Sequence, residues 1–140
     1  MRYIKSCGFV AYKKVGDEVY YLIIKGINRD IGFPKGHMES GESEIQTAVR
    51  ELKEETNVEV EVIDGFRYAM EYKLPRTTDA VKQVIYFLGK CVTDDVVYQK
   101  AELLDARFLT YGEAMKLLSF EQTRELLTEA KEFIEKNGLA

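Results

Sequence analysis

Five stretches of the chain are rich in β-branched and aromatic residues, a composition that favours strands. They span Ser6–Lys13, Glu18–Lys25, Val60–Glu71, Gln83–Val92 and Ala106–Leu109. Val15-Gly16-Asp17 joins the first two stretches and predicts a tight hairpin between antiparallel strands. The third and fourth are separated by the polar segment Lys73–Asp79, which predicts a loop. We therefore expect a mixed sheet.

Between the second and third strand stretches, apolar residues recur at helical spacing. Ser43 followed by Gln46 is a capping-box pair, which predicts a helix that begins just after Glu42. One stripe of this helix is apolar and is expected to lie against a core; it consists of Ile45, Ala48, Val49 and Leu52.

Two further helices are predicted near the end of the chain. Thr110 can cap a helix over Tyr111–Leu118. Ser119 and Gln122 form a second capping-box pair, opening a helix that runs to about Asn137, before Gly138. This last helix has a core-facing stripe composed of Leu126, Leu127, Ala130, Phe133 and Ile134.

The first helix also carries an acidic stripe of Glu51, Glu54 and Glu55, since residues three and four apart are neighbours on a helix surface. We expect this stripe to face a cleft or solvent. The three carboxylates repel one another, so we expect a bound cation to compensate. Oxygen ligands favour a hard ion such as Mg²⁺, Mn²⁺ or Ca²⁺. The alternative is an ordinary solvated face with Arg50 and Lys53 as incidental partners. A glycine-punctuated loop directly before the helix weighs against that alternative.

The segment GHMESGESEIQTAVRELKEETNV, residues 36–58, resembles the Nudix box, G-x5-E-x7-R-E-U-x-E-E-x-G-U, where U is aliphatic. The matching positions are Gly36, Glu42, Arg50, Glu51, Leu52, Glu54, Glu55 and Val58. One fixed position departs from the pattern, because Asn57 stands where the family usually has glycine. Asparagine tolerates the left-handed conformation, so the end of the helix should be preserved.

The resemblance implies a single Nudix domain over residues 1–140. Its α/β fold would be an α/β/α sandwich, with a mixed sheet between the box helix and the C-terminal helices. It also implies metal-dependent hydrolysis of a nucleoside diphosphate linked to another group, with Mg²⁺ or Mn²⁺ as cofactor. The ligands it implies are Glu51, Glu54, Glu55 and the backbone carbonyl of Lys35. Arg50 would pair with Glu42 and orient the glutamates, because a guanidinium does not transfer protons at neutral pH.

The general base is left open between Glu51 and Glu102. Related enzymes bring a late glutamate into the metal site, and Glu102 lies just before the last predicted strand. The alternative for Glu102 is a solvated loop residue. His37 is the single histidine of the chain and is a candidate for binding substrate.

Within the family, GFPKGHMESGE resembles the corresponding segment of asymmetrical diadenosine tetraphosphate hydrolases. Cys7-Gly8 and the segments GFRYAMEY and KQVIYFL extend the likeness. By this resemblance Lys35 and Lys82 would bind phosphates, and Tyr72 would stack on adenine. The alternative for Tyr72 is a sheet-edge tyrosine. Many of these enzymes have a histidine after the late glutamate, whereas residues 103–106 here read LLDA, so the base-binding end can differ.

Three other functions are alternatives to the hydrolysis of diadenosine tetraphosphate. A MutT-like nucleoside triphosphate pyrophosphohydrolase and an RNA 5′ pyrophosphohydrolase use the same box. A catalytically silent, nucleotide-sensing Nudix domain is more remote, since such a domain has no need of a complete acidic stripe. A structural Ca²⁺ module is disfavoured, because no acidic loop has EF-hand spacing.

Composition narrows the range of partners. The chain has 140 residues, 46% of them hydrophobic, which suits one compact enzyme domain. A net charge of -4 argues against a stable nucleic-acid partner and leaves a small nucleotide as the expected ligand. Cys7 and Cys91 lie in apolar runs and are expected to be buried, reduced thiols. We expect neither a signal peptide nor a membrane span, and hence a cytoplasmic protein; the oligomeric state stays open.

Overall fold

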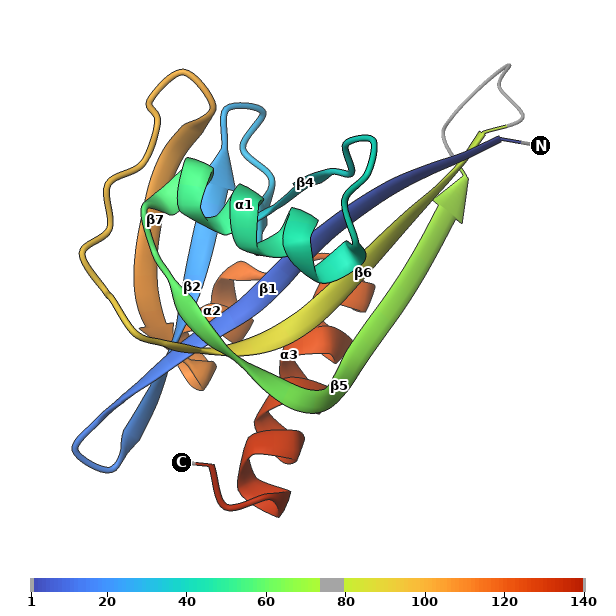
Figure 1. Cartoon of the computed structure of the whole chain (residues 1–140). Helices are drawn as coiled ribbons and strands as arrows, with labels where there is room; N and C mark the ends of the chain where they lie inside the picture. The colour runs from blue at the N-terminus through green and yellow to red at the C-terminus, as the bar shows by residue number, and fades with distance from the viewer. Residues whose placement is uncertain (1, 74–79, 140) are drawn as a thin grey trace.

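The structure is a computed structural model that describes residues 2–73 and 80–139, without the side chains of residues 2, 3, 72 and 73. Within these residues seven strands form one sheet, accompanied by three helices (Figure 1). The strands are β1 (Arg2–Val15), β2 (Glu18–Gly26), β3 (Ile31–Gly32), β4 (Lys35–His37), β5 (Val60–Lys73), β6 (Ala80–Cys91) and β7 (Leu103–Thr110). The helices are α1 (Glu44–Thr56), α2 (Tyr111–Leu117) and α3 (Glu121–Lys136).

Strand β1 lies at the centre of the sheet. It pairs in parallel with β6 from Arg2 to Tyr12, and β6 pairs antiparallel with β5. The other edge of β1 pairs antiparallel with β2, but only between Tyr12 and Val15. One parallel pairing among antiparallel ones makes the sheet mixed, as the sequence predicted.

A short segment fills the space where β1 and β2 separate. Strand β3 pairs with Ile24 and Lys25 of β2, and β4 then pairs with Ser6, Cys7 and Gly8 of β1. The opposite edge of β2 is occupied by β7. The chain thus crosses from β2 to β1 just before α1 begins, and this crossing lays the backbone of residues 35–37 beside the centre of the sheet.

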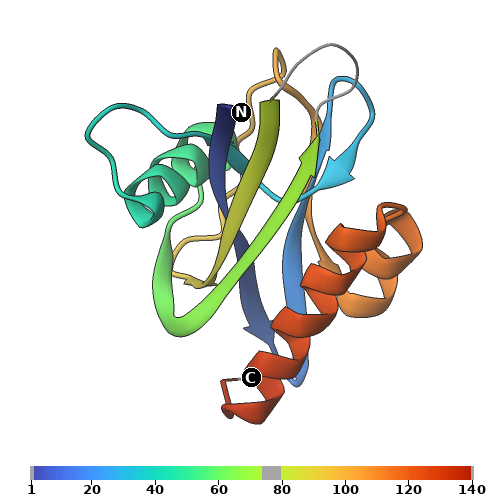
Figure 2. The ribbon, with the colours of Figure 1, turned by 90° about the vertical axis from the view of Figure 1, so that its right-hand side faces the viewer.

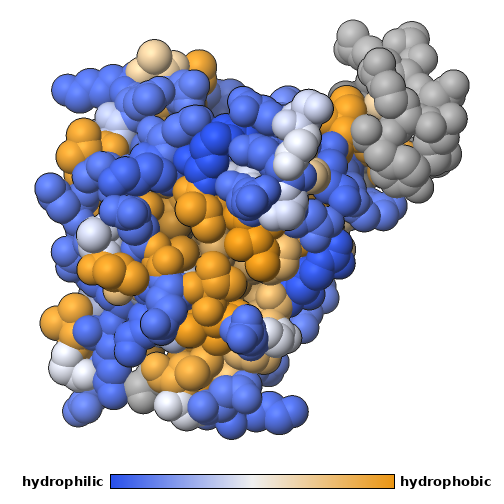
Figure 3. Space-filling model, viewed as in Figure 1, coloured by the Kyte–Doolittle hydropathy of each residue, from blue (hydrophilic) through white to orange (hydrophobic). Residues whose placement is uncertain are grey.

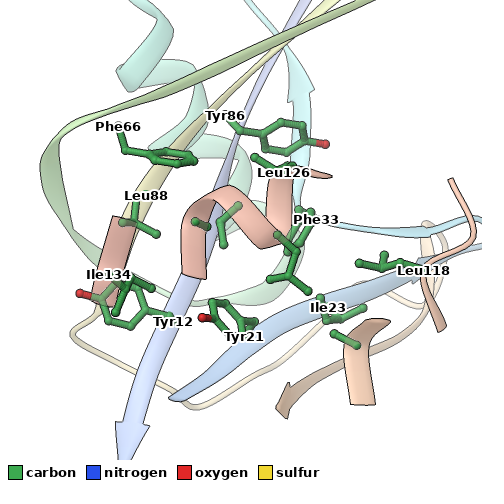
Figure 4. Packing of buried hydrophobic residues seen from close by; sticks show 14 of the residues in the cluster. Tyr12, Tyr21, Ile23, Phe33, Phe66, Tyr86, Leu88, Leu118, Leu126 and Ile134 are labelled. Atoms are coloured by element: carbon green, nitrogen blue, oxygen red, sulfur yellow. The ribbon is translucent and has the colours of Figure 1, made fainter. Parts of the chain in front are cut away.

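Helices cover both faces of the sheet, which gives the α/β/α sandwich predicted from the sequence (Figure 2). Helix α1 packs on one face through Ala48 and Leu52, against a buried cluster that includes Phe9 and Ile85. Helices α2 and α3 pack on the other face. Their larger core includes Tyr12, Tyr21, Phe33, Tyr86, Leu88, Leu118, Leu126 and Ile134 (Figure 4). On the face that carries α1, apolar side chains remain visible between hydrophilic ones (Figure 3).

The beginning and end of α1 agree with the sequence. Ser43 is the N-cap, and both hydrogen bonds of the capping box with Gln46 are present. Asn57 has a φ of 66°, and its N–H donates to the carbonyl oxygen of Lys53. The asparagine therefore adopts the left-handed conformation that the family's glycine would take. Thr110 caps α2 as predicted, again with a capping box, which Glu113 completes.

Two predictions about helix faces and caps are wrong. Ile45 and Val49 are 39% and 43% exposed, so only Ala48 and Leu52 of the predicted apolar stripe reach the core. The buried face of α1 also includes Thr47 and Glu55. Helix α3 begins one residue later than predicted, with Phe120 as an N-cap that makes no side-chain hydrogen bond. The expected capping box of Ser119 and Gln122 is therefore absent.

All five long strands were predicted, but most of the predicted ranges are shorter than the observed strands. The short strands β3 and β4 were not predicted. The predicted loop after Lys73 lies outside the described residues. Cys7 and Cys91 are both free, although Cys91 is only partly buried. Burial raises the pKa of the Cys7 thiol to about 11 and that of Cys91 to about 12. No helix in the described ranges is long and apolar enough to cross a membrane.

Candidate active site

Helix α1 is held to the sheet at its first turn by an ion-pair cluster around Glu44. Lys5 of β1 donates to Glu44 Oε2 at 2.8 Å, and Arg67 of β5 donates to both carboxylate oxygens at 2.9 and 3.0 Å. The hydrogen bond from Arg67, followed by that from Lys5, outweighs burial and lowers the pKa of Glu44 to about 2. This cluster fixes where the acidic residues further along α1 meet the sheet.

Glu51 lies directly against the backbone of Gly36 in β4. A Cβ atom added to Gly36 would overlap the carboxyl group of Glu51, far inside contact distance. Only glycine permits this approach. The Glu51 side chain is 17% exposed, and burial, with smaller contributions from Glu54 and Glu102, raises its pKa above the usual value in spite of Arg50.

Glu55 is buried against the same short strand. Its Oε1 accepts a 2.9 Å hydrogen bond from the backbone N–H of Lys35. Burial raises the pKa of Glu55 to about 7; the Lys35 hydrogen bond opposes the rise, and the charges of Glu51 and Glu102 add to it. The expectation that the acidic stripe faces a cleft or solvent is correct: the Glu54 side chain is 55% exposed, and Glu51 and the buried Glu55 line a cavity.

Arg50 connects the loop before α1 to the acidic stripe. Its Nε and Nη2 donate to the two oxygens of Glu42 at 2.6 and 3.0 Å, a bidentate pair. Its Nη1 donates to Glu51 at 2.9 Å and to Glu54 at 3.2 Å. Nη2 also donates to the carbonyl oxygen of His37. The predicted pairing of Arg50 with Glu42 and the neighbouring glutamates is thus present.

Glu42 is fixed by more than this arginine. It also accepts hydrogen bonds from the Thr47 hydroxyl at 2.8 Å and from the backbone N–H of Glu39 at 2.9 Å. These bonds, with that from Arg50 the strongest, lower the pKa of Glu42 to about 2. Glu42 therefore stays ionised and serves to hold Arg50 and the loop in place.

A cavity of about 340 Å³ brings most of the predicted residues together. Its lining consists of Ser6, Lys35, Gly36, His37, Glu39, Glu51, Glu55, Lys82 and Glu102. Acidic groups from α1, from the loop before it (Glu39) and from the turn before β7 (Glu102) thus share one cavity with two lysines. Burial, followed by the nearby charge of Lys35, lowers the pKa of Lys82. Two ammonium groups held near each other are suited to an anionic ligand.

Three predicted residues, Glu42, Arg50 and Glu54, are not part of this lining. Glu54 is on the exposed side of α1 and contacts Arg50. Tyr72 is in β5 with its backbone paired to Lys82, but its side chain lies outside the description, so its predicted stacking role stays a prediction.

Comparison with known proteins supplies the family. The NUDIX domain model matches residues 13–130. This chain belongs to the NUDIX family. Curated asymmetrical bis(5'-nucleosyl)-tetraphosphatases of Rattus norvegicus and Sus scrofa are 31% and 30% identical to it, over 94% of this chain and 95% of theirs. These comparisons confirm the prediction of a Nudix hydrolase.

Solved structures agree with the Nudix assignment. A binary complex of Caenorhabditis elegans Ap4A hydrolase has a TM-score of 0.85 and 26% identity, covering 95% of this chain and 98% of that one. The NUDIX domain of Shewanella oneidensis NrtR, solved with ADP ribose, shares the fold with a TM-score of 0.76 at 17% identity, covering 96% of this chain and 90% of that one.

Nudix hydrolases generally use divalent metal cations, and the carboxylates of this cavity suit such an ion. Beyond burial, the charges of Glu51 and Glu102 raise the pKa of Glu55, and that of Glu102 contributes to the raised pKa of Glu51; a hard cation would relieve this repulsion. Within the described part of the chain, no three His, Cys, Asp or Glu side chains already have the spacing of a metal site. Arg50 instead holds oxygens of Glu51 and Glu54.

Sequence reasoning missed three contributors to this Nudix site, one of which is Glu39 in the lining of the cavity. The tether of Glu44 to Lys5 and Arg67 joins residues distant in sequence, and nothing local to α1 indicated it. Ser6 was predicted only as the first residue of a strand. The sequence did contain a signal for Ser6. It is a polar residue on the same face of the strand as Val10 and Tyr12, whose side chains belong to the α2 and α3 core.

Proposed function

We propose that this Nudix hydrolase cleaves a phosphoanhydride bond of a dinucleoside polyphosphate, converting diadenosine tetraphosphate and water to ATP and AMP. The observation that carries the proposal is the shared cavity, whose lining combines Lys35 and Lys82 with four carboxylates, those of Glu39, Glu51, Glu55 and Glu102. A polyphosphate needs cations along its length, and the carboxylates can hold them at one point of the chain. The relatives named as asymmetrical tetraphosphatases support this substrate class.

The protein's own groups would divide the work as follows. Glu51, Glu54 and Glu55, with the Lys35 carbonyl and Glu102, would hold Mg²⁺ or Mn²⁺. Such ions neutralise phosphoryl oxygens and lower the pKa of an attacking water.

Lys35, Lys82 and His37 would bind the phosphates, and Tyr72 would stack on adenine. Arg50 keeps its proton, since its pKa is raised by its bond to Glu42, so its role is to orient carboxylates.

Either Glu51 or Glu102 would take the proton of the attacking water. Glu51 is tied to Arg50 at 2.9 Å, which restricts its motion and favours a role as ligand. Glu102 has no ion pair among those found in the described residues and lines the same cavity. Of the two, Glu102 is therefore better suited to accept a proton.

The test is a substrate panel with Mg²⁺, in which the products are identified by mass. It contains diadenosine tetraphosphate, nucleoside triphosphates, nucleotide sugars and triphosphorylated RNA. ATP plus AMP from the first substrate would support the proposal. Triphosphate hydrolysis with pyrophosphate release would favour the MutT-like alternative, and activity only on RNA the RNA 5′ pyrophosphohydrolase. No turnover together with tight nucleotide binding would favour the silent sensor.

Two substitutions check the roles of the glutamates. Glu54→Gln and Glu55→Gln should each abolish Mg²⁺-dependent turnover with the fold intact, because each removes a charged ligand and preserves side-chain volume. Glu59→Gln is the matched control, since Glu59 is exposed and, among the described residues, its carboxylate forms an ion pair only with Lys53, at 3.2 Å. Full activity of both box variants would contradict the site assignment.

A further inference from the structure

Ser6 is a polar residue buried inside the candidate site. It is 1% exposed and lines the same cavity as Lys82 and the α1 glutamates. A buried polar group is ordinarily paired, so a hydroxyl that lines a polar cavity is suited to pair with a ligand bound there.

The strand register puts Ser6 in a row with two basic side chains. Ser6 pairs with His37 of β4 on one side and with Val84 of β6 on the other. Lys82 is two residues before Val84, so it shares the face of Ser6 and stands one register step away. Three adjacent strands therefore present an imidazole, a hydroxyl and an ammonium on one face of the sheet.

The groups around this row favour an anion over a cation. Lys35 pairs with Gly8, two residues along β1 from Ser6, and a Cβ at Gly8 would stand 2.7 Å from the Lys35 Cβ. Gly8 thus lets Lys35 come close to the same row. The carboxylates of Glu51 and Glu55 enter the cavity from α1, beside β4. A chain of phosphoryl groups can contact both ends of this arrangement.

We propose that the Ser6 hydroxyl binds substrate directly, donating a hydrogen bond to a non-bridging phosphoryl oxygen between Lys82 and His37. The proposal rests on the proposed function for its phosphate ligand. In this proposal the lysines, whose side chains are mobile, supply positive charge. The Ser6 hydroxyl is a neutral donor that fixes the position of one phosphoryl group along the polyphosphate.

The experiment measures binding of imidodiphosphate, a non-hydrolysable pyrophosphate analogue, with Mg²⁺ by isothermal titration calorimetry. Ser6→Ala removes the donor, and Ser6→Cys keeps the volume with a much weaker donor. Both should weaken binding about tenfold, the usual effect of losing a hydrogen bond to a charged group. In the hydrolysis assay both should raise KM with kcat nearly unchanged, as expected for uniform binding.

Tyr12→Phe is the matched control. Tyr12 lies on the same face of β1 and its buried hydroxyl has no partner within the described part of the chain, but this side chain belongs to the α2 and α3 core. Removing that hydroxyl should leave imidodiphosphate affinity unchanged. It controls for loss of any buried hydroxyl from this strand.

Three results would overturn the role of Ser6. They are unchanged affinity in both variants, recovery of wild-type affinity by Ser6→Cys alone, which indicates packing, and failure of the wild-type protein to bind imidodiphosphate. The proposed function is judged separately by the substrate panel. A wild type that binds the analogue through Ser6 but leaves diadenosine tetraphosphate intact would refute that function and retain the phosphate-binding role.

Discussion

The carboxylate of Glu51 occupies the space that a side chain at Gly36 would need, since a Cβ added to this glycine would overlap the Glu51 carboxyl carbon. Gly36→Ala should therefore push Glu51 away from β4. Because a displacement of about 1 Å in a catalytic group can cost roughly 100-fold in rate, we expect a loss of turnover of that size.

The matched control for this substitution is Gly112→Ala. Gly112 is in α2, and nothing lies within 4 Å of an added Cβ there. This variant should keep full activity and gain about 0.5–1 kcal/mol of stability from its better helix propensity. Steady-state rates and thermal unfolding of both variants would check the prediction. Wild-type turnover by Gly36→Ala would contradict it.

The raised pKa of Glu55 predicts that the metal-free protein loses stability as pH increases. The folded pKa is about 7 and the ordinary value is 4.5, so the folded state binds the proton more tightly. Stability is then highest below about pH 4.5 and falls as pH rises to about 7. In EDTA at pH 8, Glu55→Gln should be more stable than wild type by on the order of 2 kcal/mol.

The measurement is thermal unfolding of both proteins from pH 4 to pH 8, with EDTA and with Mg²⁺. The advantage of the variant should disappear near pH 4, where the glutamate is protonated in both states. Added Mg²⁺ should stabilise wild type and not the variant, because the ion binds the charged carboxylate. An equal stability difference at every pH would count against a buried, ionisable Glu55.

The Glu44 cluster predicts the opposite pH dependence. Its folded pKa of about 2 lies below 4.5, so its stabilisation is present above about pH 4.5 and is lost as pH falls towards 2. Glu44→Gln should lower the free energy of unfolding by about 1 kcal/mol at pH 7, a value reduced by the partial exposure of Lys5 and Arg67.

Chemical denaturation at pH 7 and at pH 2.5 measures this difference. Glu135→Gln is the control, since its ion pair with Lys131 is exposed on α3 and should contribute less than about 0.5 kcal/mol. If Glu44→Gln behaved like the control, the cluster would not hold α1 to the sheet.

Asn57 allows a separate test of the end of α1. Asn57→Ala should destabilise the protein by about 1–2 kcal/mol, because alanine is strained at a φ of 66°. Asn57→Gly keeps that conformation and loses only the 3.0 Å bond from the Asn57 side chain to the Asp95 carbonyl. Urea unfolding should therefore rank the glycine variant above the alanine variant, and the reverse order would rule out a conformational role.

Local chemistry explains which parts of the site were predictable from sequence. The Ser43 and Gln46 cap, the left-handed Asn57 and the pairing of Arg50 with Glu42 all join residues within eight positions of each other. Residue type and spacing determine such contacts, so the box helix and its internal ion pairs could be derived. The long strands were found for the same reason, since composition and alternation are local properties.

The failures concern neighbours that are distant in sequence. Ile45 and Val49 have the spacing of a core stripe, but no strand covers them in the described part of the chain, whereas Glu55 is buried because β4 supplies the Lys35 N–H. Strands β3 and β4 are only two and three residues long, and they exist through their pairing with β2 and β1. No pattern within Ile31–His37 contains that information.

The parallel pairing of β1 with β6 has a consequence for biogenesis. The first strand waits for a partner that begins at Ala80, and ribosomes deliver the chain in order. When α1 has been synthesised, its acidic residues and Arg50 are all present, but β6, which carries Lys82, has not yet been made. A nascent chain should therefore pass through an interval in which α1 can form but the site cannot bind a polyphosphate. This interval ends only when β1 pairs with β6.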